Sequence, residues 1–390
     1  VGGSWNIYKE KFFQADFVDM LKLRASYGIG GNIGRNTAPY LIASYYDSSL
    51  VDGMAGSVNT PPNKDIRWEK TTTVNVGVDF ALFRHRLSGT IEYYNKYSVD
   101  LLAAINGSPT QGFGYTTLMT NNGKMVNRGV EITLSGEIIR QKDFSWNASL
   151  LYAFNRNKVK HISVQPSLWD SRISMPTSYP MVGKPLYGIY AYKWAGLNEN
   201  GDPQVYDAEN NVTSGPARDY HALVYCGTTV PIHNASLTNV LRYKGFEFSA
   251  MLILDAGHKL RSSNIPSINM SNGRITSTAK GIVDRWTQPG DVTDVPRLLF
   301  SNDTENFNTH RTELYRYSDL FVYDASNIRL SNISLAYRVP AHWCKKISLS
   351  GARLQFNVEN VATFAFDSKA NYDLGGKVKP NYVWGLYLNF

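Results

Sequence analysis

The stretch TTTVNVGVDFALF, residues 71–83, changes side-chain character at every step. One set of alternate positions is almost entirely apolar: Thr72, Val74, Val76, Val78, Phe80 and Leu82. The positions between them are polar or small: Thr71, Thr73, Asn75, Gly77 and Asp79. Successive side chains of a β-strand point to opposite faces of its sheet. The stretch therefore predicts an antiparallel strand with one apolar face and one polar face.

The same period of two recurs along the chain and predicts an all-β protein. It is clear in FSWNASLLYAF (144–154) and FEFSAMLIL (246–254), and no stretch shows a convincing helix of three turns. We count about eleven such segments, many of them longer than the usual strand of roughly 5–6 residues. The predicted strands are 17–29, 38–46, 67–83, 86–104, 124–140, 144–161, 231–243, 246–260, 320–338, 347–361 and 380–390.

The connections between these strands alternate between short and long. The short ones lie at 84–85, 141–143, 244–245 and 339–346. The long ones are 47–66, 105–123, 162–230, 261–319 and 362–379. An up-and-down barrel with this pattern has one rim of tight turns and one rim of long loops, as bacterial outer-membrane barrels do, with the turns in the periplasm and the loops outside. We therefore expect a transmembrane antiparallel up-and-down β-barrel whose apolar faces contact lipid.

Composition is compatible with this expectation. Charged residues make up 18% of the 390, below the usual quarter or so, and aromatic residues make up 13%, including 25 tyrosines. The net charge of +8 comes from scattered basic residues, so we expect no nucleic-acid partner. No segment reaches the about 20 apolar residues of a membrane helix. A soluble β-sandwich or propeller shares the strand period, but it gives no reason for alternating loop lengths.

The final ten residues, NYVWGLYLNF, form one more strand of large apolar side chains. Termini are usually polar and frayed, whereas a barrel-closing strand is held along its length. About eleven strands cannot close an up-and-down barrel, which needs an even number, and an open sheet edge is costly in hydrocarbon. The start, VGGSWNIYKE, has neither an initiator Met nor a signal peptide. We therefore expect residues 1–390 to be part of a barrel that upstream sequence completes.

Several stretches resemble the barrel of SusC/RagA-type TonB-dependent transporters. They include LKLRASYGIGGNIG (21–34), NRGVEITLSG (127–136) and YPMVGKPLYGIYAYKWAGLNENGDPQVYD (179–207). The stretches ASNIRLSNISLAYRVP (325–340) and LQFNVENVATF (354–364) and the aromatic terminus also match, so the resemblance covers nearly the whole chain in order. The stretch NYDLGGKVKPN (371–381) departs from the acidic Asp-Pro pattern expected before the last strand, which we attribute to loop variation.

The resemblance implies that the chain is the C-terminal half of an outer-membrane barrel of roughly 22 strands from Bacteroidetes. The plug inside the barrel and the segment that contacts TonB are absent from residues 1–390. The implied activity is TonB-dependent import of oligosaccharides or oligopeptides. The implied partners are a SusD-like surface lipoprotein that acts as a lid, TonB, the remaining N-terminal half of the barrel with its plug, and outer-membrane lipid.

Aromatic side chains in the long external loops are the candidate ligand contacts, because they could stack on sugar rings or hold peptide side chains. They are Phe113, Tyr115, Trp169, Tyr179, Tyr190, Tyr220 and Trp286. Packing of loop on loop, or against the lipoprotein, is the competing explanation for each of them. The resemblance also identifies the last strand as the signal read by the insertion machinery, carried by Tyr382, Trp384, Leu386, Leu388 and Phe390.

The remaining motifs favour structure over chemistry. The segment NENGDPQVYD (198–207) has alternate oxygen ligands, but Pro203 stands where a calcium loop needs glycine, so a turn is expected. The glycine-rich GIGGNIG (28–34) leads into no helix, which argues against phosphate binding. The seven histidines lack metal-ligand spacing, and no motif of a hydrolase is present, so we expect no metal, no cofactor and no enzyme. Cys226 and Cys344 should lie at opposite rims as free thiols.

Three alternative functions stay open from the sequence. A siderophore or vitamin receptor would share the TonB-dependent barrel but would need no lipoprotein lid. A non-transport barrel would serve as an adhesin or surface anchor and would gain nothing from TonB. A soluble carbohydrate-binding sandwich would remain in the aqueous phase without detergent.

Overall fold

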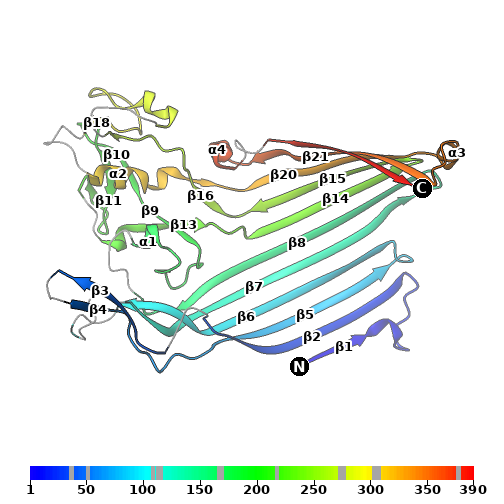
Figure 1. The fold of residues 1–390 in the computed structure, drawn as a ribbon, viewed down its shortest axis with the longest axis horizontal. Coiled ribbons are helices and arrows are strands. Elements are labelled where there is room, and N and C mark those ends of the chain that lie inside the picture. The colour runs from blue at the N-terminus through cyan, green and yellow to red at the C-terminus, as the bar shows by residue number, and fades with distance from the viewer. Residues whose placement is uncertain are drawn as a thin grey trace.

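The computed structural model describes residues 1–34, 39–49, 53–106, 110, 117–164, 171–215, 219–270, 278–300, 309–374 and 379–390. Its main feature is one antiparallel sheet of eleven strands in the order β1-β2-β5-β6-β7-β8-β14-β15-β20-β21-β22, all but β1 of them long (Figure 1). The strands are β1 (Gly2–Asn6), β2 (Val18–Asn32), β5 (Glu69–Leu82), β6 (Leu87–Asn106), β7 (Thr117–Arg140), β8 (Phe144–His161), β14 (His233–Tyr243), β15 (Phe246–Ala256), β20 (Asn327–Arg338), β21 (Gly351–Ala365) and β22 (Asn381–Asn389). Each strand of this sheet pairs with the next one along the chain, as in an up-and-down barrel wall.

The strand register places the predicted apolar positions on one face. Val78 of β5 lies between Leu23 of β2 and Ile91 of β6. On the other face, Gly77 lies between Arg24 and Glu92. Much of the apolar face is uncovered, since side chains such as Val76 and Ile91 are exposed. Uncovered apolar side chains on one face, such as Leu23 of β2, Val76 of β5 and Leu335 of β20, are what a lipid-facing barrel wall requires, so the expected fold class is confirmed.

One predicted barrel strand was wrong, and one was missed. The described part of segment 38–46, residues 39–46, does not enter the main sheet; β3 (Ile42–Ser48) pairs with β4 (Gly53–Thr60) as a separate hairpin. The eleventh place is taken by β1, which pairs with β2 from Gly2↔Ser26 to Asn6↔Lys22. A short alternating stretch supports a hairpin as well as a barrel strand, because the period does not identify the partner strand.

Other boundaries moved by a few residues. β6 and β7 run further into the predicted loop 105–123 than expected, to Asn106 and from Thr117. The predicted strand 246–260 is divided between β15 and the short β16 (Lys259–Arg261). The predicted strand 320–338 is likewise divided, between β19 (Val322–Asp324) and β20. β16 and β19 pair with each other, so the wall bends into the loop region at this point.

The long loops all leave the same end of the sheet and contain most of the remaining elements (Figure 1). Their strands are β9 (Gly188–Tyr192), β10 (Trp194–Leu197), β11 (Pro203–Tyr206), β12 (Val212–Thr213), β13 (Leu223–Thr228), β17 (Asn269–Met270) and β18 (Leu299–Phe300). Their helices are α1 (Ser171–Ser174), α2 (Thr309–Arg316) and α4 (Asn371–Leu374), with 3-10 turns at η3 (Tyr220–Ala222), η4 (Lys280–Asp284), η5 (Asp319–Phe321) and η6 (Ser368–Ala370). The largest buried core of the described residues lies here and is formed by Tyr190, Tyr192, Val205, Ala222, Leu223 and Leu314.

The opposite end of the sheet carries the short connections. Phe83, Arg84 and His85 all have positive φ in the tight turn between β5 and β6. The turn between β20 and β21 contains the short helix α3 (Ala341–Lys345), and β1 reaches β2 through the 3-10 turn η1 (Ile7–Lys9). Within the described ranges, no helix is long and apolar enough to cross a membrane.

Candidate functional site

The polar face of the wall carries a network of paired charges. Arg24 Nε donates to Asp79 at 3.3 Å, and Arg24 Nη2 donates to Glu92 at 2.5 Å. Asn75 also donates to Glu92, and Thr90 Oγ1 donates to Asp79 at 3.1 Å. These residues come from β2, β5 and β6 and share the face opposite to the apolar one. A network of this kind suits a hydrated interior rather than a hydrocarbon-facing surface.

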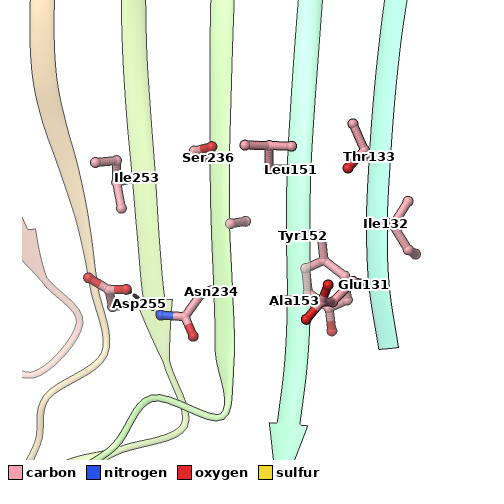
Figure 2. A pocket seen from close by; sticks show the side chains of 11 residues that line it. Glu131, Ile132, Thr133, Leu151, Tyr152, Ala153, Asn234, Ser236, Ile253 and Asp255 are labelled. Carbon is pink, nitrogen blue, oxygen red and sulfur yellow. Dashed lines mark hydrogen bonds between the residues drawn. The ribbon is translucent and has the colours of Figure 1, made fainter. Parts of the chain in front are cut away.

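A shallow hollow of about 340 Å³ lies on the polar face across β7, β8, β14 and β15 (Figure 2). One row of cross-strand neighbours contains Glu131, Ala153, Asn234 and Asp255. The Asn234 amide donates to Asp255 at 2.7 Å, and Arg329 Nη2 lies 3.6 Å from the other oxygen of that carboxylate. The hollow therefore offers carboxylate and amide oxygens that can accept hydrogen bonds from hydroxyl, amide or ammonium groups.

A second hollow, of about 430 Å³, lies where β6, β7 and β8 approach the loops. Its apolar lining includes Leu101, Leu102, Met119, Met125, Val159 and Leu186. Met125 pairs with Ser98, whose hydroxyl lies 2.8 Å from Thr71 Oγ1 on the polar face, so this pocket opens to the same side as the first hollow. The lining also includes Thr177, Ser178 and Pro180 of the loop after β8 and the polar side chains of Glu69, Lys124 and His161. An apolar pocket of this volume on a polar wall is suited to an apolar side chain of a ligand.

The loop elements are held together by a buried ion cluster. Asp202 accepts hydrogen bonds from Arg297 Nη2 and from Arg311 Nε, each at 2.8 Å. Arg311 also donates to Asn269 and to the Arg297 carbonyl, and its side chain is 4% exposed. Burial lowers the pKa of Arg311, and the Asp202 carboxylate opposes that effect. The cluster joins loop 162–230 to loop 261–319.

A further buried cation anchors β9. Arg261 donates to the carbonyl oxygens of Arg316 and Ser318 at 3.1 Å each and to that of Tyr190 at 2.8 Å. Burial lowers the pKa of Arg261. Nearby, burial raises the pKa of Asp324, but hydrogen bonds from Ser326 and Lys259 outweigh it and bring that pKa to about 2. These groups hold β9, the end of α2 and the β16–β19 pair together.

The aromatic residues predicted to contact ligand differ in how deeply the structure buries them. Tyr190 is 1% exposed in the loop core, with its ring 5.9 Å from that of Tyr225. Trp286 is half-buried against the turn at Gly201, and Tyr179 is half-buried next to α1. Tyr220 begins the 3-10 turn η3. Phe113, Tyr115 and Trp169 lie outside the described residues. Ligand contact by these residues stays a prediction.

The terminal residues occupy the apolar face as a row. Tyr382, Trp384, Leu386 and Leu388 of β22 pair with Val358, Phe356, Leu354 and Ala352 of β21. The Trp384 ring lies 4.3 Å from that of Phe356, between ring centroids. Phe390 follows the strand and is 92% exposed. The alternation predicted for this strand is confirmed, whereas its role as an assembly signal stays a prediction.

The expected turn at 198–202 is present. Asn198 Oδ1 accepts from the backbone N–H groups of Asn200 and Asp202, and Gly201 has φ +74°. Cys226 in the loop region and Cys344 in the short turn between β20 and β21 are free thiols, as expected. Sequence reasoning missed Glu131, Asn234 and Asp255, although their inward positions follow from the strand period. It could not have found the Asp202–Arg311 contact, since 109 positions separate the two residues.

The fold and the polar face define one class of protein: a β-barrel wall of the outer-membrane type, with one apolar face, one polar face and long loops at one rim. Residues 2–361 match the family described as "TonB dependent receptor-like, beta-barrel", and the chain belongs to that family.

Curated relatives carry names from the same family. TonB-dependent receptor P3 of Formosa agariphila is 26% identical over 411 residues, covering 98% of this chain and 39% of the relative. TonB-dependent receptor SusC of Bacteroides thetaiotaomicron is 26% identical over 378 residues, covering 91% of this chain and 35% of SusC. The chain therefore spans less than two fifths of the length of either relative.

The fold is also that of solved transporters. The structure of the RagAB peptide transporter matches with a TM-score of 0.77 and 24% identity, over 100% of this chain and 43% of that one. The open-open state of the RagAB peptide importer matches with a TM-score of 0.75 and 23% identity, over 100% of this chain and 42% of that one. The resemblance to SusC/RagA-type barrels is thus confirmed.

Proposed function

We propose that the protein takes part in TonB-dependent active import of oligopeptides or oligosaccharides across the bacterial outer membrane, with a SusD-like lipoprotein as lid. The observation that carries the proposal is the family match across residues 2–361 together with the SusC relative. The packed loops of this chain supply a broad rim against which a lid could close. No step of the proposed function needs covalent chemistry by this chain.

We further propose that the eleven strands are one half of a barrel of roughly 22 strands. β1 and β22 each have a single neighbour in the described sheet. An unpaired strand edge in hydrocarbon leaves hydrogen-bonding groups unsatisfied at several kcal/mol each, so closure needs further strands. These strands, a plug and the segment that contacts TonB would come from additional sequence.

Of the two substrate classes, the inner wall favours peptides. Glu131 and Asp255 supply acceptors for backbone amides or ammonium groups, and the pocket around Leu102 and Val159 supplies space for an apolar side chain. Sugars offer hydroxyl groups to the first hollow but gain little from an apolar pocket of about 430 Å³. Apolar burial of a single leucine-sized side chain is worth roughly 1.5–3 kcal/mol, which is enough to bias selection.

Uptake by whole cells tests the proposal. Labelled oligopeptides rich in leucine or phenylalanine should accumulate in cells that express the protein, and a protonophore should abolish accumulation. Leu102→Trp fills the apolar pocket and should lower uptake of these peptides severalfold, whereas Leu354→Trp on the lipid-facing side should not. Isolation of the complex in mild detergent should recover a lipoprotein of SusD type. If the protonophore does not reduce uptake, the protein is a passive barrel or an adhesin. If the isolated complex contains no lipoprotein, a siderophore or vitamin receptor is favoured.

A further inference from the structure

Three cations lie together on the apolar face of the wall. Arg128 of β7 pairs directly with Arg156 of β8, and Lys158 lies two residues beyond Arg156 on the same face. Arg128 lies opposite Asn95 of β6, which in turn lies opposite Val74 of β5. Val74 is one of the exposed residues of the apolar face, so the three cations belong to that face. All three cations are exposed. Like charges directly opposite one another across strands are destabilising, so this arrangement calls for an anion.

No carboxylate of the neighbouring strands supplies that anion. In β5–β8, Asp79, Glu92 and Glu131 are on the polar face. Glu69 binds Leu102 N and Asn32, Asp100 pairs with Arg67, and Glu137 is at the short-turn end, where it pairs with Arg140. β8 itself contains no acidic residue. Within the described ranges, no ion pair involves Arg128, Arg156 or Lys158, and Arg128 donates only to the neutral Asn95 at 3.0 Å.

The height of the three cations on the wall indicates what surrounds them. On β8 the apolar row runs from Phe144 to Phe154, which is ~33 Å of strand at about 3.3 Å per residue. With the usual tilt of about 40° this covers the ~25 Å apolar band of an outer-membrane barrel. Tyr152 donates or accepts a hydrogen bond with His233 at 2.9 Å, and Phe154 packs on the same ring, as in an aromatic girdle. Arg156 comes two residues after Phe154 on the loop side, so the cations lie at the headgroup level of the outward leaflet.

We propose that Arg128, Arg156 and Lys158 bind a phosphate group of a phosphorylated lipid headgroup in the outward-facing leaflet. The proposal rests on the outer-membrane placement contained in the proposed function. Guanidinium groups bind phosphate through short, charge-assisted hydrogen bonds, and two opposed arginines present donors from both sides. The apolar row from Phe144 to Phe154 lies directly below and gives the acyl chains of the same lipid a surface to pack against. The patch thereby fixes a lipid at the β7–β8 part of the wall.

The test uses the protein isolated from outer membranes in mild detergent. The probe is diphosphorylated lipid A in mixed micelles, compared with the same lipid after removal of its phosphates. Native mass spectrometry counts the retained lipid, and the unfolding temperature measured against lipid concentration gives an apparent affinity. The variant R128Q/R156Q/K158Q should bind lipid A roughly a hundredfold more weakly, since each cation near a membrane surface contributes about 1 kcal/mol. The dephosphorylated lipid should bind the unaltered protein as weakly as lipid A binds the triple variant.

Lys96→Gln is the matched control, because Lys96 is an exposed cation of the adjacent strand β6 on the polar face. It should bind lipid A as the unaltered protein does. The variant R128K/R156K keeps both charges but loses the guanidinium geometry, so it should bind lipid A more tightly than R128Q/R156Q/K158Q and more weakly than the unaltered protein. If the triple variant fails to assemble, Arg156→Gln alone should still weaken binding about fivefold. Equal binding by the triple variant, equal binding of the two lipids, or full stabilisation by inorganic phosphate alone would overturn the proposal. If the protein were not found in the outer membrane, that result would overturn the proposed function, not only the lipid site.

Discussion

The indole of Trp286 covers Gly201 so closely that a Cβ atom at residue 201 would lie 2.4 Å from Trp286 Cδ2. Gly201 also has φ +74°, a conformation that other residues adopt with strain. Gly290 has a similar φ of +98°, but open space surrounds its Cβ position. A substitution at Gly290 therefore introduces backbone strain alone, whereas the same substitution at Gly201 adds a steric clash with Trp286.

Gly201→Ala should disrupt the packing of the loops, whereas Gly290→Ala should cost only the backbone strain of about 1 kcal/mol. In Gly201→Ala the Trp286 ring must move, so its fluorescence should shift towards that of a solvated indole. Hydrogen exchange in residues 198–206 should also accelerate. Equal effects of the two substitutions would show that Trp286 does not constrain the turn.

Asp202→Asn should loosen the contact between the two largest loops. The substitution removes the only carboxylate paired with the buried Arg311 among the described residues, and breaking a buried ion pair costs about 3–5 kcal/mol. Hydrogen exchange in α2 and around Arg297 should accelerate by a corresponding factor. Asp207→Asn is the control, because Asp207 accepts only from neighbours in its own exposed turn, Glu209 and Asn211. Unchanged exchange in α2 would contradict this role of Asp202.

Cys226 should alkylate slowly in the folded protein. Burial raises the pKa of its thiol from 9.0 to about 11, so the reactive thiolate fraction at pH 8 falls by a factor of about 100. The rate should rise about tenfold per pH unit between pH 8 and 10. Because the unfolded thiol loses its proton first, this group should also lower folding stability as the pH rises above about 9. Mass spectrometry after N-ethylmaleimide treatment measures the rate, with Cys226→Ser as the blank.

The aromatic face of β22 should govern assembly. Trp384→Ser and Phe390→Ala should lower the fraction of protein that reaches the folded, heat-modifiable form in outer membranes. Val383→Ala is the matched control, because Val383 pairs with Asn357 and belongs to the polar face of the same strand. If the folded fraction is the same for all of these variants, the apolar row of β22 contributes to packing but not to assembly.

The strand period predicted most of the wall because each barrel strand has two different solvents on its two faces. The same period failed at 38–46, where β3 is a hairpin strand of Ile42–Ser48 paired only with β4. It also missed β1, since Gly2–Asn6 has a single large apolar side chain, Trp5. Both errors concern the choice of pairing partner, which side-chain alternation does not encode.

The site was less predictable than the wall. The inward direction of Asp255 and Glu131 follows from side-chain alternation once the strands are known, but their place in one row across β7, β8, β14 and β15 depends on the strand register. The contact of Asp202 with Arg311 depends on how two long loops fold over each other, and no local pattern specifies that. Aromatic composition alone pointed to Tyr190, which the structure buries in the loop core.

The register of β8 has a genetic consequence. Deleting one codon between Trp146 and Phe154 would turn the remainder of the strand over, so that Asn155 would face hydrocarbon and the Phe154 ring would face the polar side of the wall. Deleting two adjacent codons would restore the orientation and merely shorten the span. In-frame deletions in the wall strands should therefore be far more damaging when they remove an odd number of codons than when they remove an even number. Deletions in the long loops should show no such difference.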